Sequence, residues 1–238
     1  MNPLAPIPSS DSWEIYDATL PFAGAVYGSA HARMAVIGLG AGELLVVSPG
    51  APVSEARWAA LEGWGRPRYL LAPNHFHHAG IATWKARYPE AVVVAHPRAL
   101  PRLRRQVPGV VFEDLARLRA VLPDHVRLFS PEMARQGETW VSIRTSEGQA
   151  WFVTDGILNE RQLPPGPLGW LLALLGFRVG LLTNPFFKRL FLRDKAAYKA
   201  WVLSELERDA PTLFVPAHGV PLQGADVAEQ LKAVTDAA

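Results

Sequence analysis

Histidines supply the most informative residue types and spacing in this sequence. Three of its seven histidines, His75, His77 and His78, fall within four residues in the segment LLAPNHFHHAG. Side chains of an extended chain repeat every two residues, so His75 and His77 would point the same way if the chain stays extended. Two imidazoles on one side of a strand end can share a metal ion, and neutral imidazole suits zinc, iron or nickel.

Two further ligand-type side chains follow apolar strands far along the chain. Asp155 ends the run FVTD, and His218 follows the run FVPA. Taken singly, an aspartate after a strand is usually a turn former, and a histidine beside a glycine is usually a loop residue. Together with the histidine segment, they place ligand-type side chains at three strand ends that can converge at one sheet edge. The candidate metal ligands are therefore His75, His77, His78, Asp155 and His218.

The composition limits the chemistry that these residues can do. The chain of 238 residues has no cysteine, which excludes disulfide scaffolds, iron–sulfur clusters and cysteine nucleophiles and leaves His, Asp and Glu as metal ligands. The net charge is only +2, and the densest basic stretch, residues 102–119, contains acidic residues. We interpret that stretch as a solvated helical face and expect no nucleic-acid partner.

A glycine cluster at residues 38–42 superficially resembles a dinucleotide-binding loop. That loop requires a helix directly after the glycines, so that the phosphate meets the helix N-terminus. Here the glycines precede the strand-like run ELLVV, which favours a hairpin turn. A Gly-x-Ser-x-Gly nucleophile elbow is also absent from the sequence.

The first residues of the chain and one apolar segment indicate where in the cell the protein is expected. The start MNPLAPIPSSDSWEIYD has no basic region followed by an apolar run, so we expect no secretory signal and a cytoplasmic protein. Residues 163–192 form an apolar, helical pattern that prolines and Arg178 interrupt, so no transmembrane segment is expected. This segment is interpreted as a buried helix or as an apolar lid over the site, with contact to a membrane surface as the alternative.

The remaining pattern predicts one domain over residues 1–238, with residues 1–12 as a loose lead-in and 163–192 as an apolar helical insertion. Strands are expected at 33–37, 43–47, 68–71, 91–95, 126–129, 139–145, 149–154 and 212–215. Helices are expected at 54–64 with Ser54 as the N-cap, around 80–88, from the cap Asp194 to about 208, and at 225–236. Mixed strands and helices indicate a layered α/β or α+β fold with helices outside the sheets.

Taken in order, these motifs resemble the metallo-β-lactamase superfamily. RMAVIGLGAGELLVVSPG looks like its opening hairpin, and RPRYLLAPNHFHHAG resembles the strand that leads into its His-x-His-x-Asp-His motif. TSEGQAWFVTDGILN is similar to the hairpin that delivers the bridging aspartate, here Asp155, and LFVPAHGVPL to the segment with the last metal-binding histidine, here His218. The resemblance implies an α/β fold of four layers, an αβ/βα sandwich, whose active members bind zinc or iron and hydrolyse lactams, thioesters or phosphoesters.

The sequence also departs from that motif. With His75 and His77 as its first two histidines, the motif aspartate falls on Ala79 and its last histidine on Gly80. The segment PEMARQGETW, where a further histidine is expected, contains none. His78 is an alternative ligand if the loop is not extended or if the alignment shifts by one residue. These departures favour one zinc ion over two, with iron as the other candidate metal.

Two functions follow from these observations. The first is a divergent metal-dependent hydrolase that attacks an ester, thioester, amide or phosphoester of a small, apolar substrate through a metal-activated water, with Asp155 as the catalytic ligand that orients the water. The second is a non-catalytic protein of the same fold, with a degenerate metal site that binds metal weakly or not at all, acting as an interaction module. Nucleic-acid processing ranks third, because no nucleic-acid module is visible.

Overall fold

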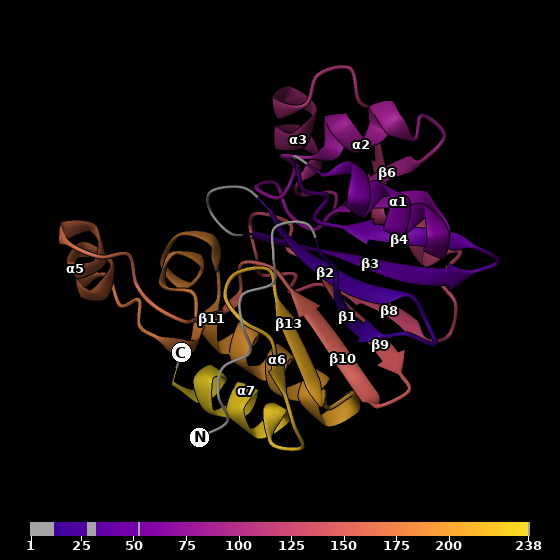
Figure 1. The fold of residues 1–238 in the computed structure, drawn as a ribbon. Coiled ribbons are helices and arrows are strands. Elements are labelled where there is room, and N and C mark those ends of the chain that lie inside the picture. The colour runs from indigo at the N-terminus through magenta and orange to yellow at the C-terminus, as the bar shows by residue number, and fades with distance from the viewer. Residues whose placement is uncertain (1–11, 28–31, 52, 238) are drawn as a thin grey trace.

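The structure is a computed structural model that describes residues 12–27, 32–51 and 53–237. The predicted lead-in, residues 1–12, lies almost wholly outside the described residues. Two large β-sheets face each other in the centre, and helices cover their outer faces (Figure 1). This arrangement confirms the predicted four-layer sandwich of helices and sheets.

The first sheet has seven strands in chain order. They are β1 (Glu14–Asp17), β2 (Phe22–Tyr27), β3 (Ala32–Gly40), β4 (Glu43–Val47), β5 (Arg66–Ala72), β6 (Val92–Ala95) and β7 (Phe112–Asp114). Strands β1 to β4 pair antiparallel, whereas β4 to β7 pair parallel and are joined by helices. Because β4 and β5 are parallel, both end at the same edge of this sheet, and Ser48 and the histidine segment follow them there.

The second sheet has the order β14-β13-β10-β9-β8. Its strands are β8 (Val126–Phe129), β9 (Trp140–Thr145), β10 (Gly148–Val153), β13 (Leu213–Pro216) and β14 (Leu222–Gln223). Strands β9 and β10, expected at 139–145 and 149–154, pair antiparallel as a hairpin, and β10 pairs parallel with β13. Parallel pairing puts the residues after β10 and β13 side by side, as the sequence predicted for Asp155 and His218.

The part of the chain that the structure describes contains seven α-helices: α1 (Glu55–Trp64), α2 (Ile81–Arg87), α3 (Leu100–Gln106), α4 (Leu115–Arg119), α5 (Pro167–Leu174), α6 (Lys195–Arg208) and α7 (Val227–Asp236). One apolar cluster packs α1, α2 and α3 on the first sheet, and another packs α6 and α7 on the second. A third cluster fills the space between the sheets. Adjacent residues Val36 and Ile37 of β3 enter different clusters, because side chains of a strand alternate between its faces.

The glycine cluster forms a hairpin turn between β3 and β4, as its sequence context predicted. Gly40, Ala41 and Gly42 all have positive φ, at 93°, 51° and 72°. This conformation suits glycine, which has no Cβ to clash with the backbone. No helix begins after the turn, which confirms that it is not a dinucleotide-binding loop.

The apolar segment 163–192 is helical only in part. It contains α5 and a π-helical turn at Phe187–Phe191, but between them β12 (Gly180–Thr183) pairs antiparallel with β11 (Ile157–Glu160). Gly176 and Gly180, with φ of 92° and 91°, break the helical pattern, and pairing with β11 then satisfies the backbone. Among the described residues, no helix is both long and apolar enough to cross a membrane.

Candidate metal centre

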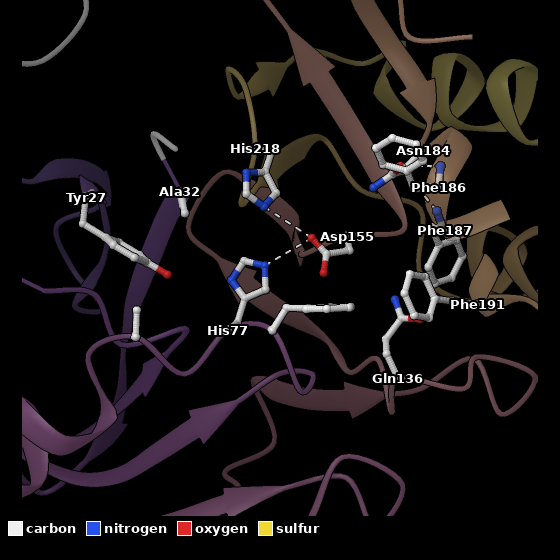
Figure 2. A pocket seen from close by; sticks show the side chains of 12 residues that line it. Tyr27, Ala32, His77, Gln136, Asp155, Asn184, Phe186, Phe187, Phe191 and His218 are labelled. Carbon is white, nitrogen blue, oxygen red and sulfur yellow. Dashed lines mark hydrogen bonds and ion pairs between the residues drawn. The ribbon is translucent and has the colours of Figure 1, made fainter. Parts of the chain in front are cut away.

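Three of the predicted ligands meet at one edge of the two sheets. His77 comes from the loop after β5, Asp155 from the end of β10 and His218 from the end of β13 (Figure 2). The Nε2 atoms of His77 and His218 lie 3.2 and 3.3 Å from Oδ1 of Asp155. Within the described residues these three side chains form the one group that offers three ligand atoms within 4.8 Å of one another.

Ser48 holds the imidazole of His77 from the other side. Its Oγ lies 2.8 Å from Nδ1 of His77 and 3.0 Å from the hydroxyl of Tyr27. Because Nδ1 is engaged, Nε2 is the nitrogen that faces Asp155. A hydrogen bond to the second ring nitrogen is the usual way in which proteins orient a metal-binding histidine.

The loop of residues 73–80 is not extended, and Asn74 explains why. Its side-chain Oδ1 accepts hydrogen bonds from the backbone N–H groups of Phe76 (2.7 Å) and His77 (3.3 Å), which turns the chain. His75 and His77 therefore point in different directions. The sequence placed both histidines on one side only if this loop were extended, and it is not.

His75 and His78 lie outside the group of three. The Nε2 atom of His75 lies 3.3 Å from Nη1 of Arg102. With its amide oriented to satisfy its neighbours, Gln106 donates to Nε2 of His78 at 3.2 Å. Burial and the charge of Arg102 lower the pKa of His75 to about 4 and also lower the pKa of His78. Both rings are engaged with α3 rather than with Asp155.

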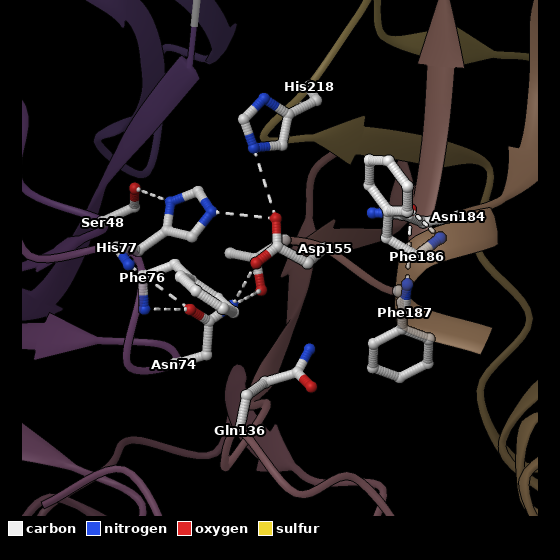
Figure 3. Close-up of polar contacts among 12 residues, drawn as sticks. Ser48, Asn74, Phe76, His77, Gln136, Asp155, Asn184, Phe186, Phe187 and His218 are labelled. Carbon is white, nitrogen blue, oxygen red and sulfur yellow. Dashed lines mark hydrogen bonds and ion pairs between the residues drawn. The ribbon is translucent and has the colours of Figure 1, made fainter. Parts of the chain in front are cut away.

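Asp155 belongs to a buried polar network that includes Asn74 (Figure 3). Nδ2 of Asn74 donates to Oδ2 of Asp155 at 2.8 Å and to Oε2 of Glu138 at 3.2 Å. Glu138 is fully buried and also accepts hydrogen bonds from the side chain of Trp140 and the backbone of Gly156. Burial and the charge of Asp155 raise the pKa of the Glu138 carboxyl. The network fixes Asp155 while keeping Glu138 out of reach of solvent.

Opposite charges favour the ionised form of Asp155. Burial opposes that form, but the charge of His77 and hydrogen bonds from His218 and His77 outweigh it and hold the pKa of the carboxyl well below its usual range. Burial likewise opposes the charged form of His77, yet Asp155 raises the His77 pKa above its ordinary value. The surroundings of Asp155 thus favour an ionised carboxylate next to a positively charged group.

The donor set fits a zinc ion. Two imidazole nitrogens and one carboxylate oxygen are common zinc ligands, and three protein ligands leave a fourth position for water or substrate. Two bonds of about 2 Å at a tetrahedral angle separate their donor atoms by about 3.3 Å. The separations of 3.2 and 3.3 Å between Asp155 and the two histidines match that value.

A cavity of about 370 Å³ opens beside the three ligands. Four phenylalanines form much of its wall: Phe76, Phe186, Phe187 and Phe191. The last three come from the apolar segment 163–192, which therefore contributes directly to the site. The amides of Gln136 and Asn184 also line the cavity, and they are polar groups that can orient a ligand.

Comparison of the whole fold identifies its class. No protein-family model matches this sequence, and no curated protein matches it. A metallo-β-lactamase from Erythrobacter litoralis, crystallised with beta mercaptoethanol in its active site, superposes with a TM-score of 0.60 and 14% identity over 98% of this chain and 99% of that chain. The chain has the metallo-β-lactamase fold. FIM-1 from Pseudomonas aeruginosa, in its mono-zinc form, gives 0.59 and 12% over 98% of this chain and 97% of that chain. DIM-1 metallo-β-lactamase gives 0.58 and 12% over 95% and 97%. The resemblance drawn from the sequence motifs is confirmed at the level of the fold.

Within this metallo-β-lactamase fold, the two positions on which the motif aspartate and its last histidine fall carry no ligand side chain. Ala79 lines the cavity with a methyl group. At Gly80 a Cβ atom would lie 2.4 Å from the backbone oxygen of Pro49, so no side chain fits without moving the backbone. In the segment where the motif has a further histidine, Nε2 of Gln136 donates a hydrogen bond to Oε2 of Glu138 at 3.1 Å. Among the described side chains, the group of His77, Asp155 and His218 is the one that offers three ligand atoms close together.

Sequence reasoning missed the residues that position the ligands. Ser48 and Asn74 orient His77, and the guanidinium of Arg33 donates to the backbone oxygens of Pro216 and Gly219, both at 2.8 Å, on either side of His218. These contacts cross between segments far apart in the chain. The one local signal was Asn74, since asparagine after proline and before a ligand segment is typical of a turn.

Proposed function

We propose that this protein is a metal-dependent hydrolase that holds one zinc ion between His77, Asp155 and His218. The observation that carries the proposal is the convergence of these three donor atoms within 4.8 Å, beside an apolar cavity. The metallo-β-lactamase fold supports it, because FIM-1, a similar structure, is described in a mono-zinc form. Iron is the competing metal, since the same donor types bind both.

A bound zinc ion would act as a Lewis acid and lower the pKa of water in its open position to about 7. The chain's own residues would orient the ligand atoms and the substrate. Asp155, fixed through Oδ2 by Asn74, keeps Oδ1 turned toward both histidines. Gln136 and Asn184 present amide groups to a polar part of the substrate, while the phenylalanine wall excludes water from its apolar part.

The cavity favours substrates with good leaving groups. Asp155 is the one carboxylate among the described residues that line it, and Glu138 is buried behind Asn74 with its oxygens already bonded. No separate acid is therefore placed to protonate an alkoxide or an amine as it leaves. Thiolates and phenolates leave without such help, so we propose apolar acyl thioesters and aryl esters as the substrate class.

A second function has its own supporting observation. Ala79 and the closely packed Gly80 stand where the motif would place ligands of a second metal. A metallo-β-lactamase fold that keeps a structural or residual metal site, without catalysis, is consistent with that loss. In this alternative the protein is a binding or interaction module.

Turnover of graded substrates distinguishes the two. Zinc-loaded and iron-loaded protein would be assayed on nitrophenyl esters and acyl thioesters of increasing chain length, with anilides and phosphodiesters in parallel. We expect zinc-dependent turnover that rises with acyl length, is abolished by a chelator and in Asp155→Ala, and persists in the matched variant His78→Gln. Metal-loaded protein that turns over none of these substrates would overturn the hydrolase and leave the interaction module.

A further inference from the structure

Helix α5 lies exposed although it is almost entirely apolar. Its sequence is PLGWLLAL, and Gly169 is its one buried residue. Trp170 and Leu174 are 74% and 85% exposed, and Leu168 and Leu171 are more than half exposed. The helix projects away from the two sheets (Figure 1). Apolar side chains exposed on this scale mark a surface that binds something.

The apolar surface continues past the end of α5. Val179, Phe186 and Leu190 are 60%, 38% and 59% exposed. The rings of Phe177 and Phe186 contact each other with centroids 4.9 Å apart, which connects the residues after α5 to the wall of the metal-site cavity. The exposed apolar residues therefore belong to one segment, residues 163–192, which we call the apolar segment.

The segment that carries these exposed apolar residues is also basic. Residues 161–193 contain no aspartate or glutamate, and their cationic residues are Arg161, Arg178, Lys188, Arg189 and Arg193. The whole chain carries a net charge of only +2, so this stretch is far more basic than the rest. Exposed leucine and tryptophan next to arginine and lysine are typical of helices that lie in the interface of an anionic membrane.

A small cationic hollow lies beside the apolar residues. It has a volume of about 170 Å³, and three cationic side chains, Arg178, Lys188 and Arg189, line it together with Thr183. No acidic residue is among its described lining residues. The guanidinium of Arg189 also donates to the backbone oxygen of Leu175, the C-cap of α5. Three cations around a hollow of this size suit a phosphate group.

We propose that the apolar segment docks on a bilayer that contains anionic phospholipid. Helix α5 and the exposed side chains that follow it enter the headgroup region, and the cationic hollow takes a lipid phosphate. Tryptophan suits that depth, because its ring is apolar and its N–H is polar. A symmetric contact with a second copy would instead bring the same cations together, which like-charge repulsion disfavours.

Docking would place the mouth of the metal-site cavity at the membrane. Phe186 is both exposed in the apolar segment and part of the cavity wall. An apolar substrate dissolved in the bilayer would then reach the cavity without crossing water. This consequence rests on the proposed hydrolase function, whereas the docking itself does not.

Vesicle co-sedimentation of the full chain tests the docking without any activity assay. The vesicles are phosphatidylcholine with and without phosphatidylglycerol, at low and high sodium chloride. We expect binding to the anionic vesicles that weakens at high salt, because exposed charges are then screened. Binding should fall at least about tenfold in Leu171→Ser/Leu174→Ser, because this variant lacks the apolar area that the two leucines would bury in the bilayer. Binding should fall less in Arg178→Gln/Lys188→Gln.

Matched variants alter exposed residues elsewhere in the chain. Val111 and Val121 are 76% and 50% exposed, so Val111→Ser/Val121→Ser controls for lost apolar surface. The variant Arg66→Gln/Arg105→Gln controls for lost charge. Both should sediment with anionic vesicles as the unchanged protein does, and far-ultraviolet circular dichroism should show every variant folded.

Three results would overturn the proposal. The unchanged protein could stay in the supernatant with both kinds of vesicle. The α5 variant could bind as well as the controls. Light scattering could reveal a dimer that Leu171→Ser/Leu174→Ser dissociates, which would show that a second copy covers the apolar segment.

Discussion

The amide of Asn74 joins both acidic side chains of the metal centre. Its Nδ2 lies 2.8 Å from Oδ2 of Asp155, while its Oδ1 accepts from the backbone of His77 (Figure 3). The same Nδ2 lies 3.2 Å from Oε2 of Glu138. One buried side chain therefore contacts both the loop that carries His77 and the carboxylate of Asp155. This relationship makes Asn74 the main positioning residue of the site.

Replacing Asn74 by alanine should loosen the site more than it unfolds the protein. Metal affinity is expected to fall by about 10- to 100-fold, because partners that orient ligands typically have effects of that size. Stability should fall by about 1–3 kcal/mol, since Glu138 and Asp155 each lose a buried hydrogen bond. Competition with a chromophoric chelator measures the first quantity and urea unfolding the second. An affinity equal to that of Asn184→Ala, whose amide lines the cavity without contacting a ligand, would contradict the assignment.

Removing the hydroxyl of Ser48 should free the ring of His77. Ser48 has a φ of 54°, so Ser48→Gly removes the Oγ and relieves the backbone, whereas Ser48→Ala keeps the unfavourable conformation. We expect Ser48→Gly to lower zinc affinity by about tenfold or more while leaving the protein folded. Tyr27→Phe, which removes only the partner of Ser48, should lower it less. Equal zinc affinities in Ser48→Gly and the unchanged protein, measured by calorimetry, would refute this role.

Gly80 should not accept a side chain. A Cβ there would lie 2.4 and 2.6 Å from backbone atoms of Pro49 and Gly50, so Gly80→Ala is expected to destabilise the protein by about 2 kcal/mol or more. Gly63→Ala is the matched control, because a Cβ at Gly63 in α1 meets no atom within 4 Å and alanine favours a helix. Thermal unfolding measures both. A Gly80→Ala variant as stable as Gly63→Ala would show that the loop can move.

Asp17 should stabilise the protein at neutral pH and cease to do so in acid. Its carboxylate is buried and accepts hydrogen bonds from the backbone of Ser146 (2.7 Å), Thr19 and Leu20. Burial opposes ionisation, but these hydrogen bonds hold the pKa of Asp17 well below its usual range. The stabilisation is therefore complete above the unfolded pKa of about 3.9 and fades as the pH falls below it toward the folded pKa.

The variant Asp17→Asn tests that dependence. We expect it to be about 1.5–3 kcal/mol less stable at pH 7, because hydrogen bonds to a charged group are lost. Urea unfolding at a series of pH values should show this difference shrinking below about pH 4. Asp124→Asn, at an exposed position, controls for the loss of one negative charge. A difference for Asp17→Asn that stays constant into acid would contradict the account.

Local signals in the sequence predicted local structure well. Ser54 and Asp194 cap α1 and α6 by accepting from backbone N–H groups three residues later, as predicted. The glycine hairpin and the strands before Asp155 and His218 also follow from short-range patterns. Strand β12 could not be found in this way, because its apolar residues gain a strand partner only when β11 lies beside them.

The choice among the three clustered histidines depended on distant contacts. Asn74 turns the loop, Ser48 orients His77, and Arg102 and Gln106 engage His75 and His78. None of these partners is encoded in the spacing of the histidines. The sequence therefore indicated candidate ligands by residue type and position, and tertiary packing brings three of them together.

Metal content tests the central claim most directly. Untagged protein would be incubated with zinc, desalted and analysed by mass spectrometry, together with His77→Ala, Asp155→Ala, His218→Ala and the matched variant His78→Gln. We expect about one zinc per chain in the unchanged protein and in His78→Gln, and its loss in the other three. His218 is 25% exposed, so its variant should stay folded and report on binding alone. Full zinc content in His218→Ala, or none in the unchanged protein, would contradict a metal centre built from His77, Asp155 and His218.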